Sequence, residues 1–136
     1  MFLVSLTYTS EMTGSMDFMD ILEVSRVNNE RDGITGVLLL FNDNVVQCLE
    51  GSREVVSKTY ARIVGDKRHM NPLLLDYRIL SARAFSKWSM GYVQASSVTR
   101  PTLLKYAVTE NFEPRSLSGE SCLGMLTELT QEVGMV

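Results

Sequence analysis

The sequence predicts an α+β fold with a mixed five-stranded sheet, two helices on one face of the sheet and a helical C-terminal segment on or near its other face. Three observations support this class. Apolar and polar residues alternate in several short segments before residue 95, which is typical of half-buried strands. Apolar residues three and four positions apart separate those segments and indicate helices. From residue 96 onward only the helical pattern remains.

The first half of the chain predicts one strand, one helix and a hairpin. Alternation over residues 2–8 indicates a strand whose core face ends in Tyr8. A helix is predicted from a cap at Ser15 to about residue 28. Two apolar strands, 34–41 and 45–50, are separated by Asn-Asp-Asn, and these residue types tolerate the backbone of a tight turn.

The next segment repeats the order of helix and strand. Ser52 is expected to cap a helix that runs to about residue 66. Asn-Pro at 71–72 is expected to end that segment, and residues 73–80 and 88–93 read as two further strands. The first six elements follow the split βαβ order of ferredoxin-like folds. A groove between the two helices, with the sheet as its floor, is therefore the expected ligand site.

The C-terminal part is predicted to be a separate helical extension. Helices are expected over residues 101–108 and 119–133, and they contain no catalytic motif. We divide the chain into a ligand-binding domain, 1–95, and a two-helix extension, 96–136, that covers the remaining face of the sheet or carries the output.

Composition, charge and cysteine spacing argue against several classes of function. With 136 residues, 45% of them hydrophobic, the chain is long enough for one globular core. A net charge of −3 argues against direct binding of nucleic acid. The N-terminus shows no targeting pattern and no apolar run of membrane-spanning length, so a cytoplasmic protein that does not bind membranes is expected. Cys48 and Cys122 lack the spacing of metal ligands, and no metal site is expected.

A lone amide interrupts the apolar pattern of the strand at 45–50. Alternate residues of a strand share a face, so Gln47 points the same way as Val45 and Leu49, into an apolar interior. Burial of an amide without a partner costs ~1–3 kcal/mol. We therefore expect Gln47 to have a hydrogen-bond partner there, in the protein or in a ligand.

Four separated motifs resemble those of BLUF domains, which are flavin-binding sensors of blue light. They are NNERDGITG at 28–36, QCLEG at 47–51, RIVGDKRH at 62–69 and FSKWSM at 85–90. Tyr8 matches the tyrosine of the family's first strand. The resemblance extends from residue 2 to about residue 92.

This resemblance implies a non-covalent flavin between the two helices, usually FAD, with FMN and riboflavin as alternatives. Photochemical residues around the flavin C4 carbonyl and N5 would be Tyr8, Gln47, Trp88 and Met90, and the family leaves open whether Trp88 or Met90 occupies the site in the dark. Residues implied in cofactor binding are Ile21, Ser25, Asn28, Asn29, Arg62, Ile63, Asp66, Arg68 and His69.

The chemistry of the residues agrees with this assignment at two points. An Asn carboxamide presents a donor and an acceptor side by side, which suits the flavin N3–H and its adjacent carbonyl, and Asn29 is implied there. Arg62, Asp66 and His69 recur at i, i+4 and i+7, so we expect them to share one helix face and converge on a polar ligand chain.

The implied function is a non-enzymatic photoreceptor. Excitation of the flavin would draw an electron and then a proton from Tyr8, and their return would leave Gln47 rearranged with a small red shift of the spectrum. The output would be made through an unidentified downstream protein or through self-association, and a homo-oligomer is expected. The alternatives are a ferredoxin-like flavin oxidoreductase, an acylphosphatase-like enzyme, or a structural adaptor that has lost its flavin.

Overall fold

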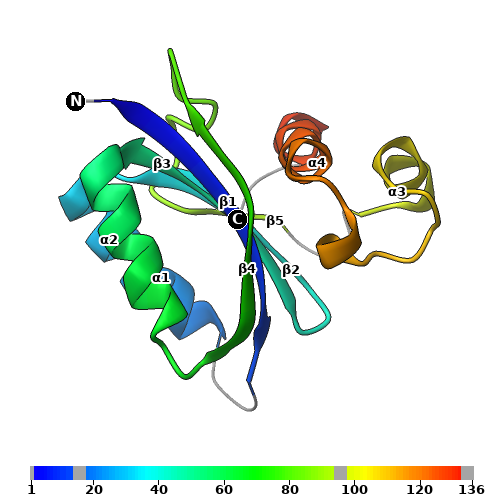
Figure 1. Ribbon diagram of the computed structural model, residues 1–136, viewed down its shortest axis with the longest axis horizontal. Coiled ribbons are helices and arrows are strands. Elements are labelled where there is room, and N and C mark those ends of the chain that lie inside the picture. Colours follow the sequence, from blue (N-terminus) through cyan, green and yellow to red (C-terminus); the bar gives the residue numbers. More distant parts are fainter. Residues whose placement is uncertain (1, 14–17, 94–97, 133–136) are drawn as a thin grey trace.

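The computed structural model describes residues 2–13, 18–93 and 98–132 and contains one five-stranded sheet (Figure 1). The strands lie in the order β4-β1-β3-β2-β5, and neighbours run antiparallel except for the parallel pair β2 and β5. Their bounds are β1 Leu3–Met12, β2 Thr35–Phe41, β3 Asn44–Ser52, β4 His69–Ile79 and β5 Gly91–Val93. The predicted α+β class with a mixed sheet is confirmed.

Helices cover both faces of the sheet (Figure 1). Helices α1, Phe18–Asp32, and α2, Arg53–Val64, lie side by side on one face. On the other side lie α3, Arg100–Tyr106, a single 3₁₀ turn, η2, Pro114–Ser116, and α4, Gly119–Glu132. The predicted tail helices and their placement are confirmed, while the division between residues 95 and 96 falls outside the described residues.

Two cores result from this layering. The helix-side core lies between the sheet and α1 and α2, and it contains Val4, Leu6, Tyr8, Leu22, Ile34, Leu38, Val45, Leu49, Val56 and Met90. The tail-side core lies between the sheet and the C-terminal helices, and it contains Val37, Leu39, Val46, Cys48, Phe85, Val93, Leu103, Phe112, Cys122, Met125, Leu126 and Leu129. Strand alternation separates the two sets, because successive side chains of one strand point to opposite faces.

Helix α1 is longer than predicted and ends at Asp32. Gly33 follows with a φ of 72°, and the N–H of Ile34 donates to the carbonyl of Asn29 at 2.8 Å. This hydrogen bond closes a helix end of the Schellman type, which requires a left-handed residue and so favours glycine. Asn29 thus belongs to the last turn of α1 and does not stop the helix. The predicted cap at Ser15 lies outside the described residues.

Helix α2 ends two residues earlier than predicted, and the strand after it begins earlier. Ser52 caps α2 as expected and accepts a hydrogen bond from the N–H of Val55, but the helix ends at Val64 and Gly65. Residues 71–72 lie inside β4, where two residues face one residue of β1 and Asn71 has a φ of 51°. A bulge on an edge strand tolerates proline, because the missing N–H costs no pairing there.

The fifth strand begins only at Gly91, so Trp88 and Met90 are not part of it and do not share a face. Met90 lies in the helix-side core, whereas Trp88 packs against the tail-side core. The prediction of one strand carrying both residues on one face was wrong. The backbone bends between them where the Trp88 carbonyl accepts from the Gly36 N–H at 3.1 Å.

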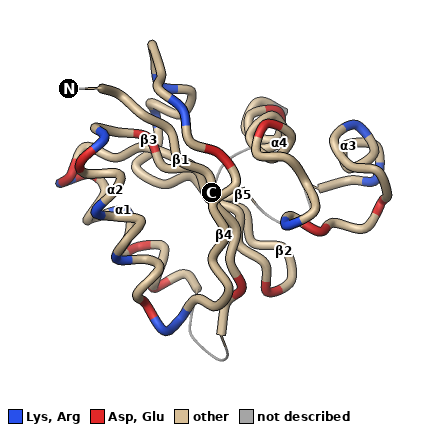
Figure 2. The backbone as a smooth tube through the Cα atoms, in the orientation of Figure 1, with Lys and Arg blue, Asp and Glu red and all other residues tan. Residues whose placement is uncertain are grey.

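Positively and negatively charged residues alternate along the backbone of α1 and α2 (Figure 2). Lys58 pairs with Glu54 one turn away on α2, at 3.1 Å, and both side chains are exposed. None of the helices within the described ranges is both long enough and apolar enough to cross a membrane.

Buried Glu50 anchors the segment that leads to Trp88 and Met90. Its carboxylate accepts hydrogen bonds from the N–H of Ala84 at 2.7 Å, from the N–H of Phe85 at 3.0 Å and from the Thr35 hydroxyl at 3.0 Å. Arg83 donates to the same Thr35 hydroxyl at 2.8 Å. Hydrogen bonds to a charged group are stronger than neutral ones, so this carboxylate fixes the path of the chain towards Met90.

Replacing Glu50 by glutamine is expected to lower the free energy of unfolding by ~2 kcal/mol, because an NH₂ group would face backbone N–H donors. Urea unfolding of both variants measures the loss. Glu54→Gln is the matched control, since that side chain is exposed, and it should change stability by less than ~0.5 kcal/mol. Equal midpoints for the two variants would show that Glu50 does not anchor this segment.

Candidate functional site

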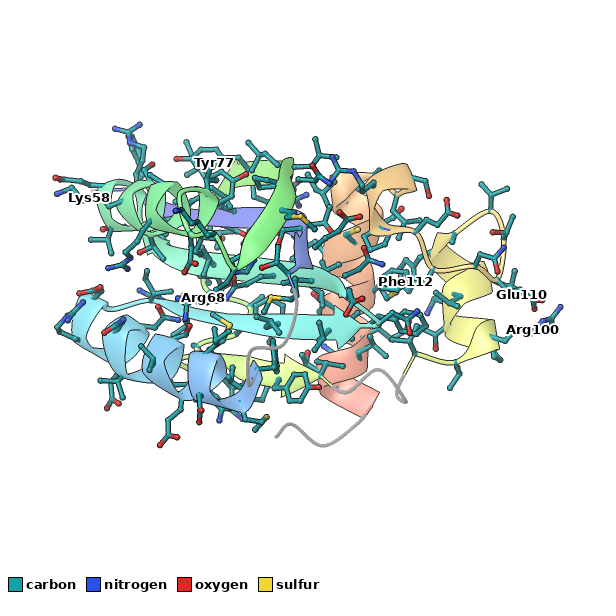
Figure 3. All side chains as sticks on the ribbon, turned by 90° about the horizontal axis from the view of Figure 1, so that it is seen from below. Lys58, Arg68, Tyr77, Arg100, Glu110 and Phe112 are labelled. Atoms are coloured by element: carbon teal, nitrogen blue, oxygen red, sulfur yellow. The ribbon has the colours of Figure 1, made fainter. Side chains whose placement is uncertain are left out.

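A pocket lies between α1 and α2 with the sheet as its floor. Arg68 lies between these two helices in Figure 3. Residues that line the pocket are Tyr8, Met12, Phe18, Ile21, Val24, Ser25, Asn28, Asn29, Leu38, Val45, Gln47, Leu49, Thr59, Arg62, Ile63, Asp66, Arg68 and His69. The groove expected from the ferredoxin-like order is therefore present.

The structure brings together every residue that the sequence analysis named for cofactor binding, from Ile21 to His69, and adds Tyr8 and Gln47. Met90 lies behind the pocket wall, in contact with Gln47. Trp88 does not reach the pocket and packs in the tail-side core. The lining residues that the sequence analysis missed are mainly apolar, such as Leu38 and Val45. A strand pattern shows that such a residue is buried, but it does not show whether its side chain contacts another side chain or lines a cavity.

Three buried side chains form a hydrogen-bonded chain that starts in the pocket wall and ends behind it. Tyr8 and Gln47 are directly opposite on β1 and β3, and the Tyr8 hydroxyl donates a short hydrogen bond to Gln47 Oε1. Gln47 Nε2 donates in turn to Met90 Sδ at 3.3 Å. Val45 and Leu49 flank Gln47 in the helix-side core, as the strand pattern predicts. Gln47 is thus satisfied on both ends of its amide by protein groups.

Burial sets the ionisation of Tyr8. The side chain is fully buried, and this loss of solvation raises the pKa of its hydroxyl well above the usual range, with a smaller contribution from Tyr60. The rings of Tyr8 and Tyr60 lie 5.3 Å apart and are tilted by 52°. Tyr8 therefore stays protonated at any physiological pH and is a hydrogen-bond donor in its resting state.

Two side chains of α1 hold the segment that carries Met90. Asn29 Nδ2 donates to the carbonyl of Ser89 at 2.9 Å, and Arg26 Nε donates to the carbonyl of Met90 at 2.8 Å. Asn29 is buried and also lines the pocket. Arg26 was not predicted from the sequence, although its position one turn before Asn29 places both residues on one side of the helix.

The polar end of the pocket is built from three elements. Arg62 lies in the last turn of α2, Asp66 in the following turn and His69 at the start of β4. The expectation that Arg62, Asp66 and His69 share one helix face was wrong, because Gly65 ends the helix before Asp66. The chain reverses there and still brings all three to the pocket.

Local hydrogen bonds set the charges at this end. Arg68 pairs with Asp66 through its backbone and side chain, and this pairing lowers the pKa of the Asp66 carboxyl to about 2. Burial lowers the pKa of His69, whose Nδ1 lies 2.9 Å from the Ser10 hydroxyl. At neutral pH the end of the pocket therefore presents two guanidinium groups, one carboxylate and a mainly neutral imidazole.

The donor set fits a flavin. A flat tricyclic ring needs apolar walls, which Ile21 and Ile63 supply from facing helices. Its polar pyrimidine edge needs amide partners, and Asn29 offers one. Arg62 and Arg68 suit the phosphates of FAD at the polar end.

Comparisons with known proteins agree with this geometry. The family model described as sensors of blue-light using FAD matches residues 3–91. Photoactivated adenylate cyclase subunit beta of Euglena gracilis is 35% identical over 92 residues, which are 65% of this chain and 11% of that protein. The blue light- and temperature-regulated antirepressor BluF of Escherichia coli is 36% identical over 93 residues, 65% of this chain and 23% of that protein. The chain thus corresponds to a small part of these relatives.

Solved structures of BlsA and BlrB match nearly the whole chain. The photo-activated state of BlsA superposes with a TM-score of 0.87 at 30% identity and covers 98% of both chains. The dark state of BlrB, a BLUF protein, superposes with a TM-score of 0.78 at 33% identity and covers 94% of both chains. The family model matches most of the chain, the pocket suits a flavin, and the fold agrees with solved BLUF structures over nearly its whole length. The chain therefore belongs to the BLUF family of blue-light sensors that bind FAD.

Proposed function

We propose that this chain is a blue-light receptor in which Tyr8 and Gln47 carry the photochemistry of a bound FAD and Met90 relays the change to the C-terminal helices. The observation that carries the proposal is the buried hydrogen-bonded chain from Tyr8 through Gln47 to Met90 in the pocket wall. FMN or riboflavin would serve the same contacts at the ring. The residues at the polar end keep the cofactor-binding roles expected from the resemblance as part of this proposal, whereas Trp88 is proposed to act in the path to the C-terminal helices and not beside the flavin.

The bound flavin supplies absorption of blue light and, once excited, accepts an electron. Tyr8 is the donor, and its hydroxyl proton follows along the hydrogen bond to Gln47. Both return to Tyr8, so no atom or electron is gained or lost over the cycle. What persists is the orientation or tautomer of the Gln47 amide, which has a different group at each end.

Rotation of this amide is sensed by Met90. In the resting state Nε2 donates to Met90 Sδ, and a thioether can only accept. Once the amide turns, Oε1 faces the sulfur, and two acceptors then meet with no proton between them. The Met90 side chain must move away, so a change in one amide becomes a change in packing.

Met90 is connected to the tail-side core by a short path. Residue 90 directly precedes β5, whose Val93 belongs to the tail-side core, and Trp88 packs against the same core. Arg26 and Asn29 hold the backbone carbonyls on either side of this bend. We infer that light shifts the equilibrium between two arrangements of this segment and of α4.

Replacing Trp88 by alanine is expected to leave the red shift at its wild-type size, because Trp88 lies outside the pocket, and to weaken the response of α4. Light-minus-dark absorption reports the first effect, and hydrogen exchange of the α4 amides in light and dark reports the second. Loss of the red shift itself in Trp88→Ala would place this residue in the photochemistry.

The decisive test is optical. The purified protein should be yellow, release FAD on denaturation as shown by mass spectrometry, and shift its absorption reversibly to the red under blue light. A colourless protein that does not take up added FAD would overturn the proposal. The output is proposed to be non-enzymatic, through binding of a separate protein or through self-association, and the similarity to the antirepressor BluF supports an output of the first kind.

A further inference from the structure

Met90 is held at two points by residues from different elements. Its sulfur accepts a hydrogen bond from Gln47 on β3 at 3.3 Å, and its backbone carbonyl accepts one from Arg26 Nε on α1 at 2.8 Å. The first bond depends on the orientation of the Gln47 amide, whereas the second does not involve that amide. Of these two bonds, only the one from Arg26 still favours the resting position of Met90 once the amide has turned.

A bend at residues 89 and 90 brings the Met90 carbonyl to α1. Carbonyls of successive residues in an extended chain point to opposite sides. Here the carbonyls of Ser89 and Met90 both accept hydrogen bonds from α1, and their donors are Asn29 and Arg26. The bend ends at Gly91, where β5 begins. The two bonds to α1 therefore fix the position from which β5 starts.

Arg26 is the donor of this pair that lies outside the cofactor site. Asn29 lines the pocket, so a change of Asn29 alters the surroundings of the flavin as well. Arg26 lies one turn earlier on α1, is half-buried and does not belong to the described lining of the pocket. It is thus placed to act on the photochemical site through the backbone of Met90 and not through a contact with the flavin.

We propose that Arg26 is a positioning residue that holds Met90 and the start of β5 in the resting arrangement and thereby sets how long the light-induced state lasts. This role rests on the proposed function, because it requires that light rotates Gln47 and displaces Met90. Rotation brings two acceptors, Gln47 Oε1 and Met90 Sδ, face to face. The bend then leaves α1 and the bond from Arg26 breaks, so this bond stabilises the resting arrangement and not the light-induced one.

Loss of the bond should slow the return to the resting state. The Met90 sulfur has to come back within reach of Gln47 Nε2 before the resting hydrogen bond forms again. The rate of return is therefore proportional to the fraction of molecules in which the bend lies against α1. A hydrogen bond from a charged donor changes such an equilibrium by roughly a factor of ten, so the red-shifted state should last about tenfold longer without it.

A matched pair of variants isolates the Nε donor. In Arg26→Gln the side-chain NH₂ is as many bonds from the backbone as Nε, and in Arg26→Met a methyl group takes that place. Both variants lose the charge and the rest of the guanidinium, so every other contact of Arg26 is removed equally in the two. Arg26→Met should keep the full red shift and return about tenfold more slowly, and Arg26→Gln should restore part of the wild-type rate.

Decay of the light-minus-dark absorption after illumination measures these rates. Arg31→Met is the control, since Arg31 lies on the same helix, is 63% exposed and pairs with Asp32, and it should return at the wild-type rate. A wild-type rate in Arg26→Met overturns the proposal. Equal slowing in Arg26→Met and Arg26→Gln also overturns it, because the effect would then come from the charge and not from the hydrogen bond to Met90.

One carbonyl signal reports the bond in the wild-type protein, without any substitution. Met90 is the only one of the eight methionines that is followed by a glycine. Protein isotope-labelled at the methionine carbonyl carbon and at the glycine nitrogen therefore gives a single correlated NMR signal, from the Met90 carbonyl and the Gly91 N–H. Acceptance of a hydrogen bond moves a carbonyl carbon to higher frequency, so illumination should move this signal to lower frequency, towards its dark position in Arg26→Met. A signal that keeps its dark position under light overturns the proposal.

The wild-type spectrum distinguishes failure of the proposed function from failure of the role of Arg26. A wild-type protein without a red shift overturns both. A wild-type protein with a red shift, but with an unchanged Met90 carbonyl signal under light, overturns only the role of Arg26. Circular dichroism confirms that each variant is folded, and the wild-type carbonyl signal decides the question if Arg26→Met does not fold.

Discussion

Phenylalanine in place of Tyr8 is expected to abolish the light-induced red shift and to leave a yellow, flavin-loaded protein. The ring of Tyr8 packs in the helix-side core, and phenylalanine keeps that packing. Only the hydroxyl that donates to Gln47 is lost, and with it the source of the electron and the proton. Removal of this donor also leaves Gln47 Oε1 unpaired, at a cost of ~1–3 kcal/mol in unfolding free energy.

Tyr60→Phe is the matched control for this variant. The ring of Tyr60 lies 5.3 Å from that of Tyr8 and packs against the same core, so it is a second phenol beside Tyr8 that does not line the pocket. Its pKa is also raised by burial, though the side chain is not fully buried. Light-minus-dark spectra should show a full red shift in Tyr60→Phe. A red shift in Tyr8→Phe, or its loss in both variants, would remove Tyr8 from its proposed role.

Alanine in place of Gly36 is expected to destabilise the fold by about 3 kcal/mol, the upper part of the range for overpacked cores. A Cβ at this position would lie 1.9 Å from the carbonyl oxygen of Cys48 and 3.3 Å from the Met90 methyl group. The backbone of β3 cannot yield without breaking its pairing, so β2 must shift. Thermal or urea unfolding measures the loss, and the spectrum should change because Met90 is displaced from Gln47.

Gly65→Ala is the corresponding control. Gly65 has a φ of −80°, and a Cβ there would meet its nearest atom at an ordinary distance of 3.5 Å. Alanine restricts the unfolded chain more than glycine, so this variant should be more stable by ~0.4–1 kcal/mol. Equal destabilisation by both substitutions would mean that the close approach at Gly36 is not what requires a glycine.

The spacing of apolar residues and the positions of turn-forming residues were sufficient to predict the order of the helices and strands. Alternation around Tyr8 and Gln47 correctly assigned both to the face covered by α1 and α2, because side-chain direction in a strand is a local property. Element ends were predicted less well. Asn71 and Pro72 read as a break, yet they form a bulge within β4, since an edge strand accepts what a central strand would not.

The residues predicted for the photochemistry were likewise placed correctly only in part. The sequence correctly placed a buried amide next to a phenol, but it grouped Trp88 with Met90 on one alternating strand. The structure separates them, because the chain bends at the contact between Gly36 and Trp88 before β5 begins. A bend imposed by a neighbouring strand leaves no periodic trace in the sequence.

By itself, the sequence determined the fold class, the order of the helices and strands and the named residues from Ile21 to His69 that line the pocket, because each of these depends on periodicity or on a motif of fixed spacing. Only the tertiary structure decided that Met90 and not Trp88 lies against Gln47, and that Asp66 and His69 reach the pocket from a turn and a strand. These features depend on contacts between segments far apart in the chain, and such contacts are set by packing of the whole molecule.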